Sequence, residues 1–471
     1  MKINYSIKNI HRILSLILII FLVCGVSPVY AQQATPDGPI YIVQSGDTLS
    51  SIADAFAVTL DALVTANNIT DVNNLAVGAQ LVIPGLEGVT GLLVGQKMPL
   101  GETLRSFARH YQVPMDTLNR LNHIVSPGSV FAGSSLIVPQ AQAEAPAQKR
   151  FSDSLNQTAL ELAAVEGVNP WTLIENNQLD GSWDIYPEDI LYIPTDPNQP
   201  DPGVLFPGVK SLEVDPLPII QGKTTVLRVN TTGPVTLTGS LDGHDLHFFP
   251  DGENSYVALQ GIHAMAEPGL VPFSLEGQVS DGTSFHFEQR VILASGNYLR
   301  DVPLQVDETL VDPTVTKPEE DKIFELTAPF DPQKMWNGIF QSPSPYTDCF
   351  NSTFGLRRSF NGSDYIYYHA GVDFCGGEGV QITAPAAGVV VFTGPLNVRG
   401  NATIISHGWG VYTGYWHQEK ILVNVGDTVE PGQVIGLVGA TGRVEGAHLH
   451  WEMIVGGVQV NPLDWLQRAY P

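Results

Sequence analysis

Residues 41–84 read YIVQSGDTLSSIADAFAVTLDALVTANNITDVNNLAVGAQLVIP, and two helical patterns lie there between two short strand patterns. Asp47 and Thr48 can cap the first helix, because their short side chains accept hydrogen bonds from open N–H groups of a first turn. Apolar residues at helical spacing give each helix a core face: Leu49, Ile52, Ala53 and Phe56 in the first, and Leu60, Leu63 and Val64 in the second. The stretch predicts a βααβ module.

This module resembles a LysM domain over its whole length. The matching features are the GDTL turn, the two asparagines after the second helix, a late glycine and the closing LVIP. The resemblance implies that turns form a shallow groove for glycans containing N-acetylglucosamine. The residues that we expect to contact such a glycan are Gly46, Asp47, Thr48 and Asn67.

Two further copies follow at an interval of just over 50 residues. Residues 93–139 contain LGETLRSFARHYQVPMDTLNRLNHI and a closing LIVP. Residues 151–194 contain LNQTALELAAVEGVNPWTLIENNQL and ILYIP but lack the glycine-acid turn, so we interpret them as a degenerate third copy. The alternative is that the second and third copies only space the domains.

The N-terminus and the charge limit the function classes. Residues 1–31 combine a basic start, an apolar run over 13–26 and a small residue, Ala31, at a cleavage position, so we predict a signal peptide and an exported, wall-associated protein. An uncleaved anchor is the alternative, but the run is shorter than the roughly 20 residues of a spanning helix. We expect no membrane attachment after cleavage. A net charge of -25 argues against nucleic-acid binding, which needs a basic face.

The 471 residues suffice for several domains. After a linker rich in Asp and Pro at 195–203, residues 204–305 alternate in strand fashion between turn signals, which predicts an immunoglobulin-like β-sandwich. Residues 306–337 are acidic and contain prolines, and we interpret them as a connector with at most one short helix. The fold class is therefore multidomain, with βααβ modules first and β-rich domains after them.

Five of the twelve histidines lie between positions 369 and 450. His369 and Asp373 stand four apart in YYHAGVDFCG, and both types of side chain bind divalent metals. His448 and His450 stand two apart in AHLHWEM, and in a strand such residues project from the same face. Three protein ligands and an open position are typical of a catalytic zinc, since a water must occupy the fourth place.

Residues 338–468 resemble the lysostaphin-type zinc endopeptidases of peptidoglycan. The matching stretches, in this order, are Phe354-Gly355 with Arg357, HAGVD, APAAGVVVFTG, ISHGWGVYTGYWHQ, the glycine-rich run that ends in AHLHWE, and NPLDWL. The resemblance implies a β-rich catalytic domain with one Zn²⁺, bound by His369, Asp373 and His450. It implies that His417 and His448 are unliganded histidines that handle the proton, and it leaves open which of them is the general base.

Three further residues carry expectations. His407 matches a family position that is not a ligand, so we assign it to packing or hydrogen bonding. Trp416 replaces a smaller residue before His417, and we expect it to narrow the substrate cleft. Cys349 and Cys375 are the cysteines left after signal cleavage, and in an oxidising compartment we expect a disulfide. The alternative is a free Cys375 thiol near the zinc.

The functional prediction is an exported zinc endopeptidase that cuts stem-peptide or cross-link bonds of peptidoglycan and is held on the wall by its LysM modules. A catalytically silent relative, which binds peptidoglycan or activates another hydrolase, is the alternative. The sequence leaves open which bond is cut, because the loops around the cleft determine that specificity. It also leaves open whether another domain covers the cleft.

Overall fold

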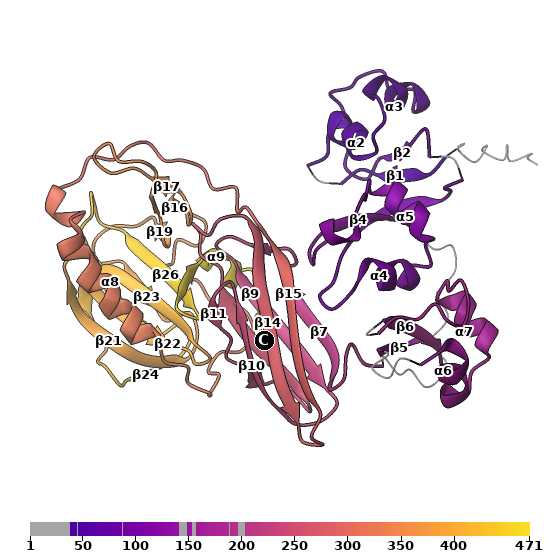
Figure 1. The fold of residues 1–471 in the computed structure, drawn as a ribbon. Helices are drawn as coiled ribbons and strands as arrows, with labels where there is room; N and C mark the ends of the chain where they lie inside the picture. Colours follow the sequence, from indigo (N-terminus) through magenta and orange to yellow (C-terminus); the bar gives the residue numbers. More distant parts are fainter. Residues whose placement is uncertain are drawn as a thin grey trace, which may run out of the picture. The chain divides into compact units, whose positions relative to one another are not determined.

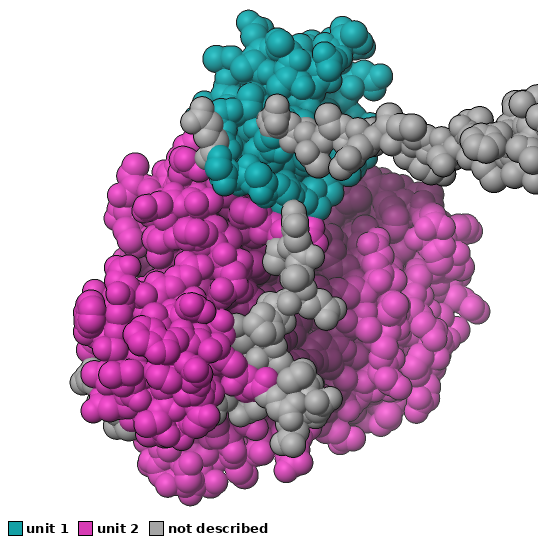
Figure 2. Space-filling view, turned by 90° about the vertical axis from the view of Figure 1, so that its right-hand side faces the viewer, with its two compact units in different colours: residues 1–92 teal, residues 93–471 magenta. Residues whose placement is uncertain are grey.

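The computed structural model describes residues 38–44, 46–86, 88–140, 148–152, 157–187, 189–195 and 203–471. The signal peptide predicted for residues 1–31 lies outside the described residues. The chain forms two compact units, residues 1–92 and residues 93–471, which Figure 2 colours separately.

The first unit holds one βααβ module, as its sequence predicts (Figure 1). Its elements are β1 (Ile40–Ile42), α2 (Leu49–Ala55), α3 (Leu60–Ala66) and β2 (Gln80–Val82), and β1 pairs antiparallel with β2. Thr48 caps α2 by accepting from the Ser51 amide. Asp47 accepts from the Tyr41 hydroxyl and the Gln44 amide instead. The expected helix faces form the core, with Ile52 and Leu63 almost fully buried.

One asparagine ties the second helix of the module to its last strand. The Asn67 amide donates to the carbonyls of Leu63 and Val82, both at 2.8 Å, and its oxygen accepts from the Val82 amide at 2.6 Å. Buried backbone groups need such partners. Asn67 thus uses both amide hydrogens inside the fold, and its contact with glycan stays a prediction.

The second unit begins with two modules of the same construction. Their elements are β3 (Leu92–Lys97), α4 (Leu104–His110), α5 (Met115–Leu121), β4 (Ser135–Pro139), β5 (Gln148–Ser152), α6 (Ala159–Glu166), α7 (Pro170–Asn176) and β6 (Ile190–Pro194), with a 3-10 turn at Pro127–Ser129. Asn122 and Asn177 repeat the bonds of Asn67 to a helix carbonyl and to the last strand. A buried ion pair of 2.7 Å joins Arg109 to Asp189 across the two modules. The degenerate third copy therefore keeps the βααβ form.

Among the described residues, no single helix has the length and apolarity to cross a membrane. Only α2 and α3 taken together pass that test, as a pair bent by 106°.

Residues 209–294 form two sheets. The strands are β7 (Val209–Asp215), β8 (Ile219–Ile220), β9 (Thr224–Thr231), β10 (Val235–Leu241), β11 (His244–Asp245), β12 (Phe249–Pro250), β13 (Ser255–Gly261), β14 (Gly269–Val279) and β15 (Ser284–Ala294). One sheet has the order β11-β10-β14-β15-β8 and the other β12-β13-β9-β7. All pairs are antiparallel except β15 with β8. The alternation in the sequence predicts this all-β character.

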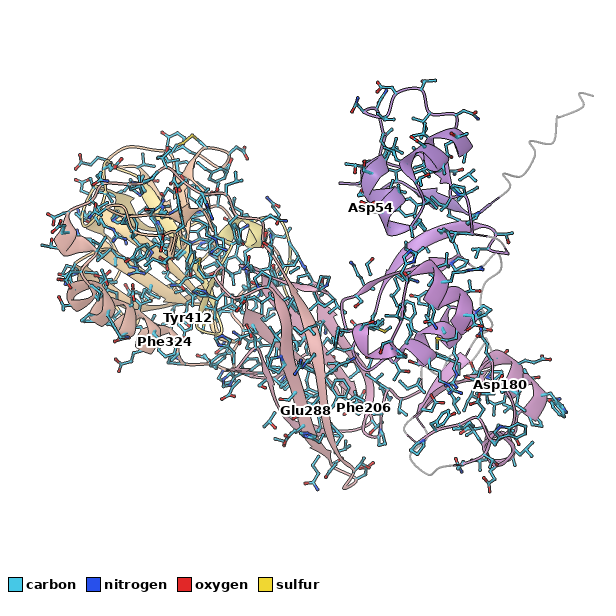
Figure 3. The ribbon with its side chains drawn as sticks, turned by 45° about the horizontal axis from the view of Figure 1, so that its top comes forward. Asp54, Asp180, Phe206, Glu288, Phe324 and Tyr412 are labelled. Atoms are coloured by element: carbon cyan, nitrogen blue, oxygen red, sulfur yellow. A yellow bond between two sulfur atoms is a disulfide. The ribbon has the colours of Figure 1, made fainter. Side chains whose placement is uncertain are left out.

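The acidic connector is more structured than its composition suggests. After a 3-10 turn at Glu308–Leu310, α8 (Pro313–Thr327) runs for 15 residues, whereas we expected at most a short helix. Asp312 caps α8, and Pro313 occupies its first turn, where a missing N–H costs nothing. Ile323 is buried on one side while Phe324, labelled in Figure 3, is 63% exposed. The helix therefore packs through one narrow face.

The C-terminal part is built on a large sheet and holds five of the chain's twelve histidines. Its strands are β16 (Phe350–Ser352), β17 (Arg357–Arg358), β18 (Tyr367–Tyr368), β19 (Val372–Phe374), β20 (Gln381–Thr383), β21 (Gly388–Leu396), β22 (Gly400–Ser406), β23 (Val411–Ile421), β24 (Thr428–Val429), β25 (Val434–Val438), β26 (Leu449–Val455) and β27 (Val458–Val460), followed by α9 (Pro462–Trp465). The large sheet has the main order β16-β19-β26-β23-β22-β21-β24, and β17 pairs with β18 in a separate two-stranded sheet. This sheet is β-rich, as predicted.

Side chains of the central strand β26 pack on both sides of the sheet. Leu449, Trp451, Met453 and Val455 belong to a core that also holds Val257 and Leu259 of β13. Ile454 belongs to a different cluster, which contains Ile323 of α8 and Tyr412 of β23. Figure 1 shows α8 lying along β21, β22 and β23, and Figure 3 labels Tyr412. Successive strand residues alternate in this way, so even-numbered residues of β26 share the face that α8 covers.

Candidate metal centre

Strand register brings the separated sequence motifs to one point. β19 pairs antiparallel with β26, and Asp373 stands directly opposite His450. His369 lies four residues before Asp373, at the end of β18, and its backbone is fixed by hydrogen bonds with Leu356 and Gly355. His448 precedes β26 and shares a face with His450. The pairs that the sequence pattern singled out are therefore neighbours in space.

Three side chains point their donor atoms at a common centre. His369 Nε2 lies 3.0 Å from Asp373 Oδ1, and His450 Nδ1 lies 2.8 Å from the same oxygen. The two ring nitrogens are themselves 3.0 Å apart. One donor atom from each of these residues fits within 4.8 Å of the others, and in the described residues this is the group able to hold a metal ion.

Hydrogen bonds on the far side of each ring fix which nitrogen faces the centre. His369 Nδ1 lies 2.9 Å from the Thr353 carbonyl, which can only accept, so Nδ1 carries the proton. His450 Nε2 lies 3.2 Å from Glu452 Oε1 and donates to it. The inward nitrogens of both rings are then lone pairs. Bonds of this kind orient histidine ligands of metals.

This donor set fits a divalent cation such as Zn²⁺. Two nitrogen lone pairs that face each other at 3.0 Å beside a carboxylate oxygen repel one another unless a cation lies between them. Two imidazoles and one carboxylate are also ligands that zinc accepts, and a set of three leaves a position open for water. The residues present therefore suit a metal centre of the open type.

His417 and His448 border this group without belonging to it. His417 Nδ1 donates to the Thr441 carbonyl at 2.8 Å, and His448 Nδ1 donates to the Gly446 carbonyl at 2.9 Å. In each ring the carbonyl engages Nδ1 and not Nε2, and the two ring centres lie 5.2 Å apart. His448 Nε2 is 3.5 Å from Asp373 Oδ1. His417 has a φ of 64°, a left-handed conformation that is uncommon outside glycine.

Burial and mutual charge set the protonation of the site. Burial raises the pKa of Asp373, but the neighbouring His369 and His450 outweigh it and hold that pKa well below its usual value. Burial lowers the pKa of His417 to about 3, with the neighbouring His450 acting in the same direction. His417 is therefore a neutral ring at neutral pH, which leaves its Nε2 able to accept a proton.

Two arginines near the site, Arg358 and Arg399, were not singled out by the sequence analysis. Arg358 Nη2 lies 3.8 Å from Asp373 Oδ2 and donates to Ser352 at 3.0 Å. Arg357, which carried part of the resemblance, donates to the Ala264 carbonyl on the other side of its strand. Arg399 lies behind the ligands, 3.7 Å from Glu452 Oε1. Side chains alternate along a strand, so the placement of Arg357 on one side of β17 could have indicated that Arg358 faces the other side, toward the site.

His407 and Trp416 have structural positions. His407 is fully buried, donates from Nδ1 to the Ala387 carbonyl at 2.8 Å and lies 2.9 Å from the Thr413 hydroxyl, which agrees with the expected hydrogen-bonding role. The expectation that Trp416 narrows the cleft is wrong, because Trp416 is only 1% exposed and packs with Ile323 of α8.

Cys349 and Cys375 form a disulfide with a Cα–Cα distance of 5.3 Å. The pairing is the one that the sequence predicts, and it excludes the alternative of a free Cys375 thiol. The Cys375 amide also donates to the Cys349 carbonyl at 3.0 Å. The bridge thus fastens β16 to the end of β19, two residues beyond Asp373.

Two family models match parts of the chain. Residues 367–462 match Peptidase family M23, and residues 41–84 and 100–139 match the LysM domain. Residues 151–194 lie outside the matched ranges.

Relatives and a solved structure match the same region. Peptidoglycan DD-endopeptidase ShyA of Vibrio cholerae is 42% identical over 113 residues, 24% of this chain and 26% of the relative. DD-carboxypeptidase/endopeptidase Mpg of Neisseria meningitidis is 42% identical over 96 residues, 20% of this chain and 22% of the relative. A crystal structure from Pseudomonas aeruginosa described as a peptidase M23 is 25% identical and covers 54% of this chain and 96% of its own, with a TM-score of 0.40. The chain spans about a quarter of the length of the curated relatives it matches.

Proposed function

We propose that this chain, which carries a peptidase family M23 domain and two LysM domains, is a zinc-dependent endopeptidase of peptidoglycan. One observation carries the proposal: the donor atoms of His369, Asp373 and His450 converge, with two further histidines beside them. Three ligands with room for water are what hydrolysis at a metal needs, whereas a structural site would be closed by four.

In this proposal His369 Nε2, Asp373 Oδ1 and His450 Nδ1 hold one Zn²⁺. The ion, when bound, acidifies a water and polarises the carbonyl of the bond to be cut. His417 and His448 stand beside the three proposed ligands, each with its Nδ1 hydrogen-bonded to a backbone carbonyl. One of them would take the proton of the water at its Nε2, and the other, once it carries a proton on Nε2, would donate to the charged oxygen that develops at the cut bond. Both rings present the same atom, so separate variants are needed to assign the two tasks.

The substrate that we infer is a cross-link or stem-peptide bond between D-amino acids. Two relatives at 42% identity are named for such activities, a DD-endopeptidase and a DD-carboxypeptidase/endopeptidase. The matched residues in this chain include the site and its strands. A glycyl-glycine bridge is the competing substrate. The digestion of cell walls described below distinguishes the two substrates.

The N-terminal modules are proposed to bind the glycan strands of the wall. The first module presents Gly46, Asp47 and Thr48 at the turn before α2, which is where the family resemblance implies a sugar groove. Binding there would concentrate the catalytic domain on its substrate even if each module binds weakly. This role requires export, which the predicted signal peptide would supply.

We also infer that the two-sheet domain is immunoglobulin-like. If β7, β9, β12 and β13 are taken as strands A, B, D and E, one sheet has the order A-B-E-D. The other sheet then has C and F with G beyond them, formed by β10, β14 and β15. This order would match the two sheets of an immunoglobulin constant domain, which supports the inference.

Digestion of whole cell walls tests the proposed activity. The full chain would be incubated with sacculi that have direct D,D cross-links and with sacculi that have glycine bridges, with and without a chelator. We expect new termini between D-amino acids by mass spectrometry, no release after chelation and none from His450→Ala. Asp364→Ala, an exposed acid outside the group, is the matched control.

The alternative function is a silent relative that binds peptidoglycan or activates another hydrolase. It predicts bound zinc and bound wall without any new peptide termini. Zinc binding, sacculus pull-down and fragment release should therefore be measured on the same preparation, because release alone separates the two functions.

A further inference from the structure

The helix α8 covers the same face of the sheet as the metal centre. Asp373 and His450 are opposite each other on that face, and Glu452 and Ile454 follow His450 at two-residue steps. Ile454 packs with Ile323 of α8. The acidic connector is thus packed one or two side chains away from the ligands.

One acidic residue of α8 is buried against the loop that leads into β22. Glu319 is 5% exposed. Its Oε2 accepts from the Val398 amide at 2.8 Å, and its Oε1 accepts from the Arg399 amide at 3.2 Å and from Arg399 Nη1 at 3.0 Å. A buried carboxylate with three donors is fully engaged, and its removal leaves those donors without a partner.

Arg399 connects Glu319 to a metal ligand. The guanidinium lies between two buried carboxylates, with Nη1 at 3.0 Å from Glu319 and Nη2 at 3.7 Å from Glu452 Oε1. Glu452 in turn accepts from His450 Nε2 at 3.2 Å. The chain of contacts therefore runs from α8 to the nitrogen that sets the tautomer of His450.

The same loop also fixes the position of His417. The His417 amide donates to the Arg399 carbonyl at 2.9 Å, while its ring donates to the Thr441 carbonyl. A Cβ on Gly400 would lie 2.3 Å from that Thr441 carbonyl, so the two loops touch backbone to backbone. Glu319, by binding both amides at 398–399, holds the support of His417 as well as that of His450.

We propose that Glu319 is a positioning residue of the metal centre, acting through Arg399 and Glu452, and that α8 is part of the catalytic unit rather than a connector. The inference rests on the proposed metal site but not on the identity of the bond cut. The Glu319 carboxylate keeps Arg399 against Glu452, and Glu452 keeps the lone pair of His450 Nδ1 turned inward.

Zinc affinity of the full chain tests the proposal, with Zn²⁺ alone as the probe and a competing chelator to set its free concentration. Glu319→Gln removes the charge and one acceptor at nearly constant volume. Glu325→Gln, an exposed acid on the same helix, is the matched control. Glu452→Gln and the double variant with Glu319→Gln complete a cycle, and far-UV circular dichroism checks the fold.

We expect Glu319→Gln to bind zinc about 10-fold more weakly, near the lower end of the effects of outer-sphere residues. Glu325→Gln should keep the parent affinity. The loss in the double variant should be smaller than the sum of the two single losses, because both act on His450. If Glu319→Gln does not fold, Glu319→Asp, which keeps the charge, takes its place in the cycle with a smaller loss.

Parent zinc affinity in a folded Glu319→Gln variant, or additive losses in the cycle, would overturn the proposal. A parent chain that binds zinc and releases no peptide would refute the proposed function while leaving this inference standing. A parent chain that binds no zinc would overturn both.

Discussion

Asp373 and His450 are directly opposed residues on two antiparallel strands, with 2.8 Å between Asp373 Oδ1 and His450 Nδ1. They are far apart in the sequence, and the register of β19 against β26 alone brings them together. His369 needs only the short turn before β19 to join them. Two of the proposed ligands therefore depend on strand pairing and one on local geometry.

Loss of a proposed ligand should abolish tight zinc binding. In Asp373→Ala, two imidazoles remain, and we expect zinc affinity to fall by more than the roughly 10- to 100-fold that outer-sphere changes cause. Bound metal after gel filtration would be measured by a zinc-sensitive dye, with Asp364→Ala as control. One zinc per chain in Asp373→Ala would contradict the ligand assignment.

Loss of either histidine that we propose to handle the proton should reduce turnover but not metal content. We expect His417→Ala and His448→Ala to lower kcat by about 10²- to 10⁴-fold, the usual contribution of acid-base groups, with zinc retained. The exposed His286→Ala is the control. The variant that loses the limb of the pH–rate profile governed by a base identifies the general base. Unchanged kcat in both variants would exclude these histidines from catalysis.

Opening the disulfide should destabilise the sheet around the site. Cys349 and Cys375 are separated by 26 positions, and closing a loop of this size contributes roughly 3 kcal/mol to the free energy of unfolding by the chain-entropy estimate. We expect the Cys349→Ser, Cys375→Ser double variant to unfold at lower urea concentration than the parent. A reductant should shift the parent and not the variant; equal midpoints without reductant would count against this contribution.

His407 should make the folded state sensitive to acid. Burial lowers its pKa to about 4, while the unfolded chain has the ordinary value of about 6.5. Above pH 6.5 the ring is neutral in both states, so its contribution is fully present there. As the pH falls from about 6.5 to 4, only the unfolded chain takes up the proton. The free energy of unfolding therefore decreases by roughly 3 kcal/mol in total over this range.

Urea unfolding at several pH values between 4 and 8 measures this effect. The difference in free energy of unfolding between the parent and His407→Gln should shrink as the pH falls through that range, because glutamine does not titrate. A difference that stays constant with pH would mean that the buried ring is not the cause.

Some of this site could be predicted from the sequence because its signals are local. The spacing of His369 and Asp373, and of His448 and His450, places each pair on one turn or one strand face. His417 was found only through the family resemblance. Glu319, Arg399 and Glu452 could not be found, since their contacts join residues 80 and 53 positions apart. The helix α8 was underestimated because it has Pro318 in its interior and a narrow apolar face.

In the βααβ modules, too, local features could be predicted from the sequence and long-range contacts could not. Helix faces and caps follow from short-range patterns, and Thr48 caps α2 as expected. The buried pair of Arg109 and Asp189 joins two modules and has no local signature. Trp416 was misplaced for a related reason, since the sequence could not indicate that α8 covers its ring.

The two-sided strand β26 also determines where the protein can be cut. A fragment that begins at residue 338 would lose the part of the core beside Met453 and Val455 that Val257 and Leu259 supply. It would also lack α8 on the other side. The sheet that bears the proposed metal centre therefore keeps both sets of contacts only in a fragment that begins before the two-sheet domain, near residue 204.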